Sequence, residues 1–204
     1  MTEIVSMTAW PEDPSRIRHI LSLSGGKDSA ALAVHMRDRV PNMEYIFHDT
    51  DKELPDTLAY LERLEGYLGR KITRTTFGTT FDSILRMKGG MLPSNHRRWC
   101  TELMKLKPFE NYIGNDFVIN YVGIRADEDR VGSISHKPNI RAVFPFREEG
   151  LDYSGVQRIL EDSGLGMPPY TEWGRTRSGC FFCFYQQKIE WVRLKQKYPE
   201  LYEQ

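Results

Sequence analysis

The chain has 204 residues, which is enough for one α/β domain with a sizeable core and too few for two comfortable ones. Hydrophobic residues make up 40% and charged residues 27%, and 28 Lys and Arg residues balance 28 Asp and Glu residues, so the composition is that of an ordinary soluble globular protein. No window of about 18 apolar residues and no signal-peptide start occur, which excludes a membrane span and predicts a cytoplasmic protein.

The predicted strands and helices alternate along the chain. Apolar runs predict strands at 18–23, 44–48, 71–77, 117–123 and 142–146. Helical spacing of apolar residues predicts helices at 29–39, 55–68, 100–113, 153–162 and 188–201. Stretches rich in Gly and Pro predict loops at 88–94 and 164–179. This alternation predicts an α/β fold, a mostly parallel sheet with helices on both faces, in one domain at 17–204 that follows an N-terminal extension at 1–16.

The string Ser-Gly-Gly-Lys-Asp-Ser at 24–29 lies between the first predicted strand and helix, where free backbone N–H groups and the helix dipole favour an anion. Two glycines allow close approach of phosphate oxygens, and Lys27 can neutralise their charge. Asp28 can cap the helix or hold Mg²⁺. An ordinary βα turn is the alternative, but the complete string favours a phosphate site. It is not a Walker loop, which needs Gly-x-x-x-x-Gly-Lys.

This string resembles the phosphate loop of the PP-loop ATP pyrophosphatase family. The resemblance implies a Rossmann-like fold of the adenine nucleotide alpha hydrolase type, with the nucleotide across the carboxyl ends of the parallel strands. Members of that family typically cleave ATP between the α and β phosphates and adenylylate a substrate. The sulfonucleotide reductases keep the fold and bind an adenylyl sulfate instead.

A narrower resemblance, over about residues 17–190, is to the phosphoadenosine phosphosulfate reductase branch. Segment 48–57 resembles its Asp-Thr-Gly…Pro-Glu-Thr motif, and segment 123–130 resembles its Gly-Leu-Arg…Ser-Arg motif. The resemblance implies catalytic roles for Lys27, Asp28, Asp49 and Arg125. It implies that the nucleotide is bound by Ser24, Gly25, Gly26, Lys27, Asp28, Ser29, Asp49, Thr50, Gly123, Arg125 and Arg130. His48 is predicted to be structural.

The three cysteines predict reduced thiols that bind a metal or react, because an odd number fits poorly with a disulfide framework. Cys100, a long spacer and the pair Cys180 and Cys183 resemble adenylyl sulfate reductases with a [4Fe–4S] cluster, although Trp99 stands where their first cysteine would be. The resemblance implies a cluster on three thiolates with one iron open for sulfide. A zinc site completed by His96 and plain buried cysteines stay open as alternatives.

The sulfonucleotide reductases end with a Glu-Cys-Gly segment whose cysteine attacks the sulfonucleotide sulfur, and no such segment occurs near the end of this sequence. Segment 98–108 instead resembles the sulfur-transfer component of DNA phosphorothioation systems. We therefore expect an enzyme that cleaves ATP with Mg²⁺ to AMP and pyrophosphate for sulfur insertion, with DNA or another nucleic acid as acceptor. A cysteine desulfurase as sulfur donor and a homo-oligomer are the other partners expected.

Two alternatives remain. One is a phosphoadenylyl or adenylyl sulfate reductase of sulfate assimilation whose nucleophilic cysteine lies on a longer native chain; the final helical pattern lacks a stop signal, which favours a longer protein. The other is a non-catalytic nucleotide-binding subunit. Net neutrality does not exclude nucleic acid, because residues 96–98 (His-Arg-Arg) form a local basic run, although a solvated charged face is the plainer interpretation. Arg175 and Arg177, just before the cysteine pair, are predicted to stabilise a negative cluster.

Overall fold

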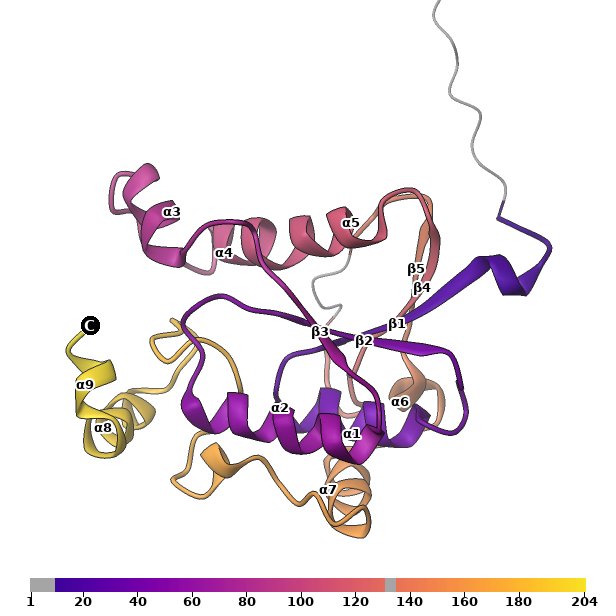
Figure 1. Cartoon of the computed structure of the whole chain (residues 1–204). Helices are drawn as coiled ribbons and strands as arrows, with labels where there is room; N and C mark the ends of the chain where they lie inside the picture. The colour runs from indigo at the N-terminus through magenta and orange to yellow at the C-terminus, as the bar shows by residue number, and fades with distance from the viewer. Residues whose placement is uncertain (1–9, 131–134) are drawn as a thin grey trace, which may run out of the picture.

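The computed structural model describes residues 10–130 and 135–204, so residues 1–9 of the expected N-terminal extension lie outside the described residues. Its core is a parallel five-stranded sheet in the order β3-β2-β1-β4-β5 (Figure 1). The strands are β1 Ile17–Leu23, β2 Met43–His48, β3 Ile72–Thr75, β4 Phe117–Tyr121 and β5 Ile140–Val143. The predicted α/β class, with a parallel sheet between helices, is confirmed.

Helices cover both faces of the sheet (Figure 1). The helices are α1 Lys27–Met36, α2 Pro55–Leu68, α3 Phe81–Met87, α4 Trp99–Thr101, α5 Lys107–Ile113, α6 Pro145–Glu148, α7 Tyr153–Asp162, α8 Lys188–Lys197 and α9 Pro199–Tyr202. Helices α1, α2 and α7 lie on one face, and the segment from α4 to α5 lies on the other. No helix in the described ranges is both long and apolar enough to cross a bilayer.

Strand β1 is apolar toward both faces because it is the central strand. Leu21 and Leu23 pack in the larger core with α1 and α2, whereas Ile20 points to the opposite face and packs with Phe109 and Ile113 of α5. Successive side chains of a strand point to opposite faces, so residues 18, 20 and 22 share the α5 face. This alternation decides which polar residues near the carboxyl end of the sheet face one another.

In two of the predicted elements a proline interrupts the regular structure. The strand predicted at 142–146 was wrong beyond Val143, because Pro145 begins α6 with its fixed φ and missing N–H. The helix predicted at 188–201 is interrupted at Tyr198, whose extended-like backbone (φ −136°) precedes Pro199. Helix α3 was not predicted; it is short and begins after Thr80, whose side chain accepts a hydrogen bond from the Ser83 N–H at 3.2 Å.

The order of the strands creates a crevice beside β1. The chain leaves β1 toward β2 on one side and returns later to β4 on the other, so β1 has a parallel neighbour on each side. In open α/β sheets, ligands bind where the strand order reverses, outside the carboxyl ends of the strands. In this chain that point lies at the end of β1, directly before the 24–29 string.

Candidate functional site

The loop at residues 24–29 forms a tight, hydrogen-bonded cradle at the start of α1. The Ser24 and Ser29 hydroxyls are hydrogen-bonded to each other at 3.1 Å, and the Ser24 N–H donates to Ser29 Oγ at 3.1 Å. Helix α1 begins after Gly26, and no side chain in the described ranges caps its first turn. The first N–H groups of the helix therefore remain available for an anion.

Glycines are required in this cradle by two different constraints. Gly25 has φ +67°, and an added Cβ would lie 2.3 Å from Thr57 of α2, so both conformation and space exclude a side chain. Gly123, at the end of β4, would place a Cβ 2.9 Å from the Asp28 carbonyl. The absence of a side chain at Gly123 lets the β4 end pass directly beside the first turn of α1.

A group of charged side chains closes one side of the cradle. Arg125 donates from Nη1 to Asp28 Oδ1 at 2.7 Å and from Nε to Asp127 at 2.8 Å. Lys27 Nζ lies 3.4 Å from Asp28 Oδ2 and 5.7 Å from the centre of the Tyr153 ring. Lys27, Asp28 and Arg125, all predicted to be catalytic, are therefore brought together, with Asp28 between the two cations.

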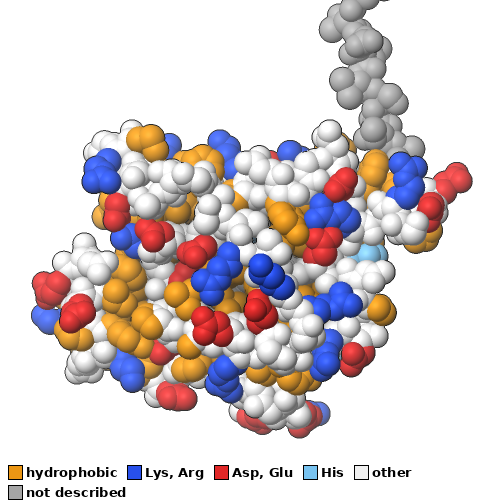
Figure 2. All heavy atoms as spheres, viewed as in Figure 1, with side chains coloured by type: hydrophobic (Ala, Val, Ile, Leu, Met, Phe, Trp, Pro, Cys, Tyr) orange, Lys and Arg blue, Asp and Glu red, His pale blue; other side chains and the backbone are white. Residues whose placement is uncertain are grey.

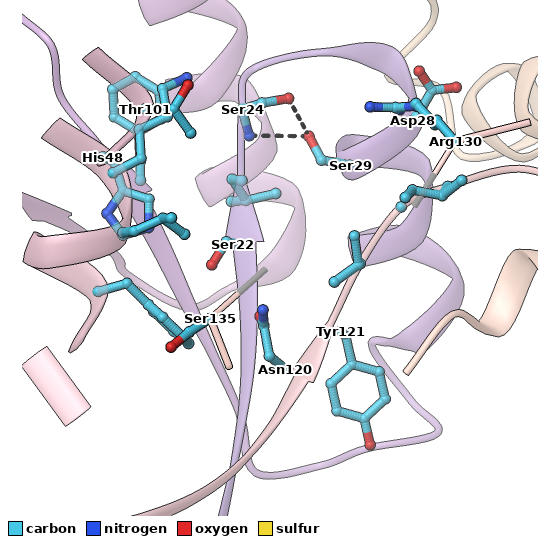
Figure 3. Close-up of a pocket in the computed structure, with 18 of the residues that line it drawn as sticks. Ser22, Ser24, Asp28, Ser29, His48, Thr101, Asn120, Tyr121, Arg130 and Ser135 are labelled. Carbon is cyan, nitrogen blue, oxygen red and sulfur yellow. Dashed lines mark hydrogen bonds between the residues drawn. The ribbon is translucent and has the colours of Figure 1, made fainter. Parts of the chain in front are cut away.

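A cavity of about 310 Å³ lies between the carboxyl half of the sheet and the α4–α5 segment (Figure 3). Five of the residues predicted to bind a nucleotide line it: Ser24, Asp28, Ser29, Gly123 and Arg130. In the close-up these loop residues lie at one end of the cavity, and Ser22, Asn120 and Ser135 lie toward the other. The cavity thus extends from the loop down the α5 face of the sheet.

Polar side chains line the part of this face where apolar ones would otherwise pack. Ile20, Ile46 and Val118 pack against α5, but one step further along each strand the same face carries Ser22, His48 and Asn120. These three residues were not predicted to bind a ligand. The periodicity that assigns a face to each strand residue could have revealed them, since a polar residue that follows a buried apolar one on the same face indicates a cavity.

The polar atoms of this row are uncharged and one lacks a partner. Asn120 is 7% exposed, and its Oδ1 has no hydrogen-bond partner within the part of the chain that the structure describes. His48 Nδ1 is hydrogen-bonded to Thr75 Oγ1 at 2.6 Å, and burial, assisted by the nearby Lys105 charge, lowers the pKa of His48 to about 4. A neutral imidazole and an amide can form hydrogen bonds with the edge of a heteroaromatic base. They carry no positive charge and are therefore less suited to phosphate than a cationic side chain is.

The cations stand around the cavity rather than on its floor. Arg98 and Lys105 line it from the α4–α5 segment, and Arg130 lines it from the β4 side. Lys105 lies in a wider helical turn, Glu102–Leu106, in which the Lys107 N–H bonds the Glu102 carbonyl. Pro108 accounts for this turn, because a proline disrupts the regular i→i−4 pattern of a helix. On the molecular face in Figure 2, basic and acidic side chains are intermixed.

The three cysteines lie near one another beside this cavity. The Cys183 N–H donates to the Cys180 carbonyl at 3.0 Å, and Cys100 packs against the same apolar cluster as Phe182, the chain neighbour of Cys183. Thr50 is hydrogen-bonded to Cys180 Sγ at 3.2 Å and donates to Glu53 at 2.7 Å. Burial raises the pKa of the Cys180 thiol to about 12 and also raises the pKa of Cys100.

No three His, Cys, Asp or Glu side chains in residues 10–130 and 135–204 stand in positions that would hold a metal ion. His96, the predicted fourth zinc ligand, is exposed in the turn between Ser94 and Arg97. Trp99, at the place of the missing fourth cysteine, is buried and donates to the Met91 carbonyl at 3.0 Å.

Six of the predicted nucleotide-binding residues do not line the cavity: Gly25, Gly26, Lys27 and Arg125, which belong to the cradle or contact it, and Asp49 and Thr50. Asp49 accepts from the Asp51 N–H at 2.9 Å, which stabilises a turn in which Asp51 has φ +65°. Thr50 is buried and contacts Cys180. Arg175, predicted to stabilise a negative cluster, is 1% exposed and donates to backbone carbonyls around the cysteine pair, including Cys180 O at 2.8 Å.

Comparisons with known proteins agree with this geometry. The family model described as phosphoadenosine phosphosulfate reductase domain matches residues 18–144. That range includes the loop at 24–29 and Cys100 and ends before Cys180. A crystal structure of phosphoadenylyl-sulfate (PAPS) reductase from Candida auris, in a phosphate complex, is similar in fold, with a TM-score of 0.62 at 13% identity over 81% of this chain and 82% of that chain.

Two proteins of Methanocaldococcus jannaschii are similar in sequence. The uncharacterized protein MJ0066 is 29% identical over 199 residues, which cover 90% of this chain and 40% of that protein. The uncharacterized protein MJ0973 is 28% identical over 195 residues, which cover 89% of this chain and 45% of that protein. The chain therefore spans less than half the length of these curated relatives.

Proposed function

The chain belongs to the phosphoadenosine phosphosulfate reductase domain family, and from this premise we propose that it binds an adenine nucleotide and activates a substrate for sulfur transfer. The phosphates lie against the 24–29 loop, and the base lies in the cavity beneath it. MgATP is the proposed nucleotide, and Asp28 is the carboxylate at the loop that would meet its Mg²⁺.

The observation that carries this proposal is the pairing of an uncapped helix N-terminus with a polar cavity. The N-terminus of α1 and Lys27 suit phosphate oxygens, and the unpartnered Asn120 Oδ1 suits the amino group of a base. A buried acceptor without a partner costs free energy in the unbound protein, which a ligand amino group would offset.

The proposed reaction is adenylyl transfer. An oxygen of the acceptor attacks the α-phosphorus of ATP, the bond to the β-phosphate oxygen breaks, and pyrophosphate leaves. Lys27 and the first N–H groups of α1 stabilise charge on the phosphates, and the hydrogen bond from Arg125 orients Asp28. The sulfur nucleophile then displaces AMP from the activated acceptor.

We propose a nucleic acid as the acceptor, with the backbone phosphate as the adenylylated group. Arg97 and Arg98 of the basic run are exposed, and Arg98 also lines the cavity, so a phosphate chain bound there would reach the nucleotide. Reduction of an adenylyl sulfate is the second candidate, because the same loop and cavity suit that nucleotide and the family model bears its name.

The three cysteines are the proposed sulfur-handling site, with a [4Fe–4S] cluster, or else zinc, as their cofactor. Three thiols are the donor chemistry that these metals prefer, and one position would stay open for sulfide. Among the described residues the three cysteines are not positioned to bind one metal ion, so metal binding would require them to move closer to one another. No step of the proposed adenylyl transfer depends on that metal.

The reaction is tested by incubating the chain with MgATP and a nucleic acid and separating the products. We expect AMP and pyrophosphate in equal amounts, with Lys27→Ala about 100-fold slower, because it removes a cation that stabilises transition-state charge. The exposed Lys71→Ala is the matched control and should keep the wild-type rate. Release of ADP and phosphate would contradict adenylyl transfer, and sulfite from adenylyl sulfate with a thiol reductant would support the second candidate.

A further inference from the structure

Segment 174–180, which lies outside the residues matched by the family model, packs directly on the phosphate loop. The Ser178 hydroxyl donates to Ser24 Oγ at 3.3 Å, and Lys27 Nζ donates to the Thr176 carbonyl at 3.4 Å. These contacts join residues about 150 positions apart and bring the segment before the cysteine pair onto the cradle.

Gly26 shows how closely Ser178 approaches. Its φ of −96° is open to any residue, so backbone conformation does not explain a glycine there. An added Cβ would lie 2.6 Å from Ser178 Oγ and 3.1 Å from Ser24 Oγ. The missing side chain at Gly26 therefore makes room for the Ser178 hydroxyl inside the cradle.

Three hydroxyls thereby form a continuous row at the N-terminus of α1. Ser178 Oγ lies 3.3 Å from Ser24 Oγ, which lies 3.1 Å from Ser29 Oγ. Each hydroxyl can rotate to donate to an anionic oxygen, and at present they bond one another. The buried Asn120 Oδ1 in the adjoining cavity, which has no partner in residues 10–130 and 135–204, is an independent sign that a ligand belongs here.

Ser178 is held in position from both sides. The buried Arg175 side chain donates to the carbonyls of Arg177, Gly179 and Cys180 at 2.8 to 3.3 Å. On the other side of Arg175, Glu190 of α8 accepts from the Thr176 N–H at 2.6 Å. The backbone on which Ser178 stands is thus anchored, and the same anchor fixes Cys180 two residues later.

We propose that Ser178 is a phosphate-binding residue of the cradle and that segment 174–180 couples phosphate binding to Cys180. This inference rests on the proposed nucleotide function and extends it to the C-terminal part of the chain. The ligand class is the terminal phosphate oxygens of a nucleotide or free pyrophosphate. When phosphate oxygens replace the Ser24 contact, the Ser178 hydroxyl donates to them, and this added contact makes transient opening of the segment that exposes Cys180 less frequent.

The test is calorimetric titration of the full chain with ATP, pyrophosphate and adenosine. Ser178→Ala should bind ATP and pyrophosphate about 10-fold more weakly, because one hydrogen bond to a charged group is lost, while its affinity for adenosine stays at the wild-type value. Ser15→Ala, an exposed serine outside the site, is the matched control. Unchanged ATP affinity in Ser178→Ala would overturn the inference about Ser178 and leave the proposed function standing. No ATP binding by the wild type would overturn both.

The coupling is tested by the rate at which Cys180 is alkylated, followed by mass spectrometry of its peptide. Saturating pyrophosphate should slow alkylation of Cys180 at least 5-fold in the wild type and less than 2-fold in Ser178→Ala at equal occupancy. Equal protection in both proteins would overturn the coupling. Thermal melting of Ser178→Ala within about 2 °C of the wild type excludes misfolding as the cause, since this hydroxyl bonds only weakly in the unbound protein.

Discussion

Asn120 illustrates, at the scale of one residue, the conflict between folding and binding. On the same face of β4, Val118 packs against α5, whereas Asn120 lines the cavity. The Asn120 Oδ1 has no hydrogen-bond partner among the residues that the structure describes. A buried acceptor in this state costs about 1–3 kcal/mol. Such a cost is expected at a site shaped for a ligand and not at one shaped only for stability.

We therefore predict opposite effects of Asn120→Leu on stability and on binding. Leucine has nearly the same shape and removes the unpartnered acceptor, so the melting temperature should rise by about 2–4 °C. The affinity for ATP should fall about 10-fold, because the base loses its acceptor. Differential scanning fluorimetry and calorimetry measure the two quantities, with exposed Asn115→Ala as control. Loss of stability together with unchanged affinity would show that Asn120 is purely structural.

His48 predicts a pH dependence of stability. Burial lowers its pKa from 6.5 to about 4, so the unfolded chain takes up this proton at a higher pH than the folded chain does. The contribution of His48 to the free energy of unfolding is then fully present above about pH 6.5. This contribution falls by about 3 kcal/mol in total as the pH drops toward 4.

In urea unfolding between pH 4 and 7, His48→Gln should lose this part of the pH dependence, while exposed His136→Gln should keep it. Acidic groups contribute equally to all three proteins, so the comparison isolates His48. An identical pH slope in wild type and His48→Gln would contradict a neutral buried imidazole.

At the scale of an element, segment 174–187 has little regular structure and is organised by one side chain. Arg175 donates to four backbone carbonyls and to Gln186 Oε1, the last at 3.0 Å. The planar guanidinium can reach acceptors in several directions at once, which an ammonium on a flexible stem cannot. The cysteine pair is therefore positioned by a buried arginine and not by a helix or a sheet.

Arg175→Lys should accordingly loosen the cysteine pair without unfolding the sheet. We expect a loss of about 2–4 kcal/mol in stability, since buried carbonyls lose their donors, and alkylation of Cys180 at least 10-fold faster than in the wild type. Arg177→Lys is the control, because Arg177 is exposed. If the alkylation rate stayed at the wild-type value while stability fell, Arg175 would support the fold generally and not the cysteine pair.

At the scale of the whole molecule, the loop after β1 and the segment from α4 to α5 line one cavity at the carboxyl ends of the strands (Figure 1). The C-terminal segment with the cysteine pair contacts that loop through Ser178. Sulfur chemistry at the cysteines and phosphate chemistry at the loop would share Lys105, which lines the cavity and whose charge acts on Cys100 and Cys180. The binding of a [4Fe–4S] cluster by the three cysteines stays a prediction.

Anaerobic purification followed by iron, sulfide and zinc analysis tests whether the three cysteines bind a [4Fe–4S] cluster. We expect about four irons and four sulfides per chain, with a broad absorption lost in Cys183→Ser, because three thiolates can close around a cluster once metal offsets their mutual repulsion. Nucleotide affinity should be unchanged in Cys183→Ser, since no cysteine lines the cavity. Stoichiometric zinc, or no metal in the wild type, would contradict the cluster and leave the nucleotide chemistry standing.

Local pattern alone determined much of this protein. The alternation of strands and helices, the bounds of α2 and α7 and the strand–loop–helix at 17–36 follow from periodicity and turn residues that act over a few positions. Boundaries at prolines were less well predicted, because a strand-like or helical apolar pattern continues past Pro145 and Pro199 while the backbone cannot.

Tertiary structure alone decided which side chains meet. Nothing local in the sequence brings Ser178 to Gly26 or Thr50 to Cys180, because these contacts depend on strand order and on the path of the chain between distant segments. The same holds for Asn120 Oδ1, which has no partner within the described part of the chain. The sequence by itself thus determined the fold class and the strand–loop–helix that carries the 24–29 string. The cavity, its polar row and the contact between the cradle and the cysteine segment arise only when the sheet forms, because each is built from residues that pack together across long stretches of chain.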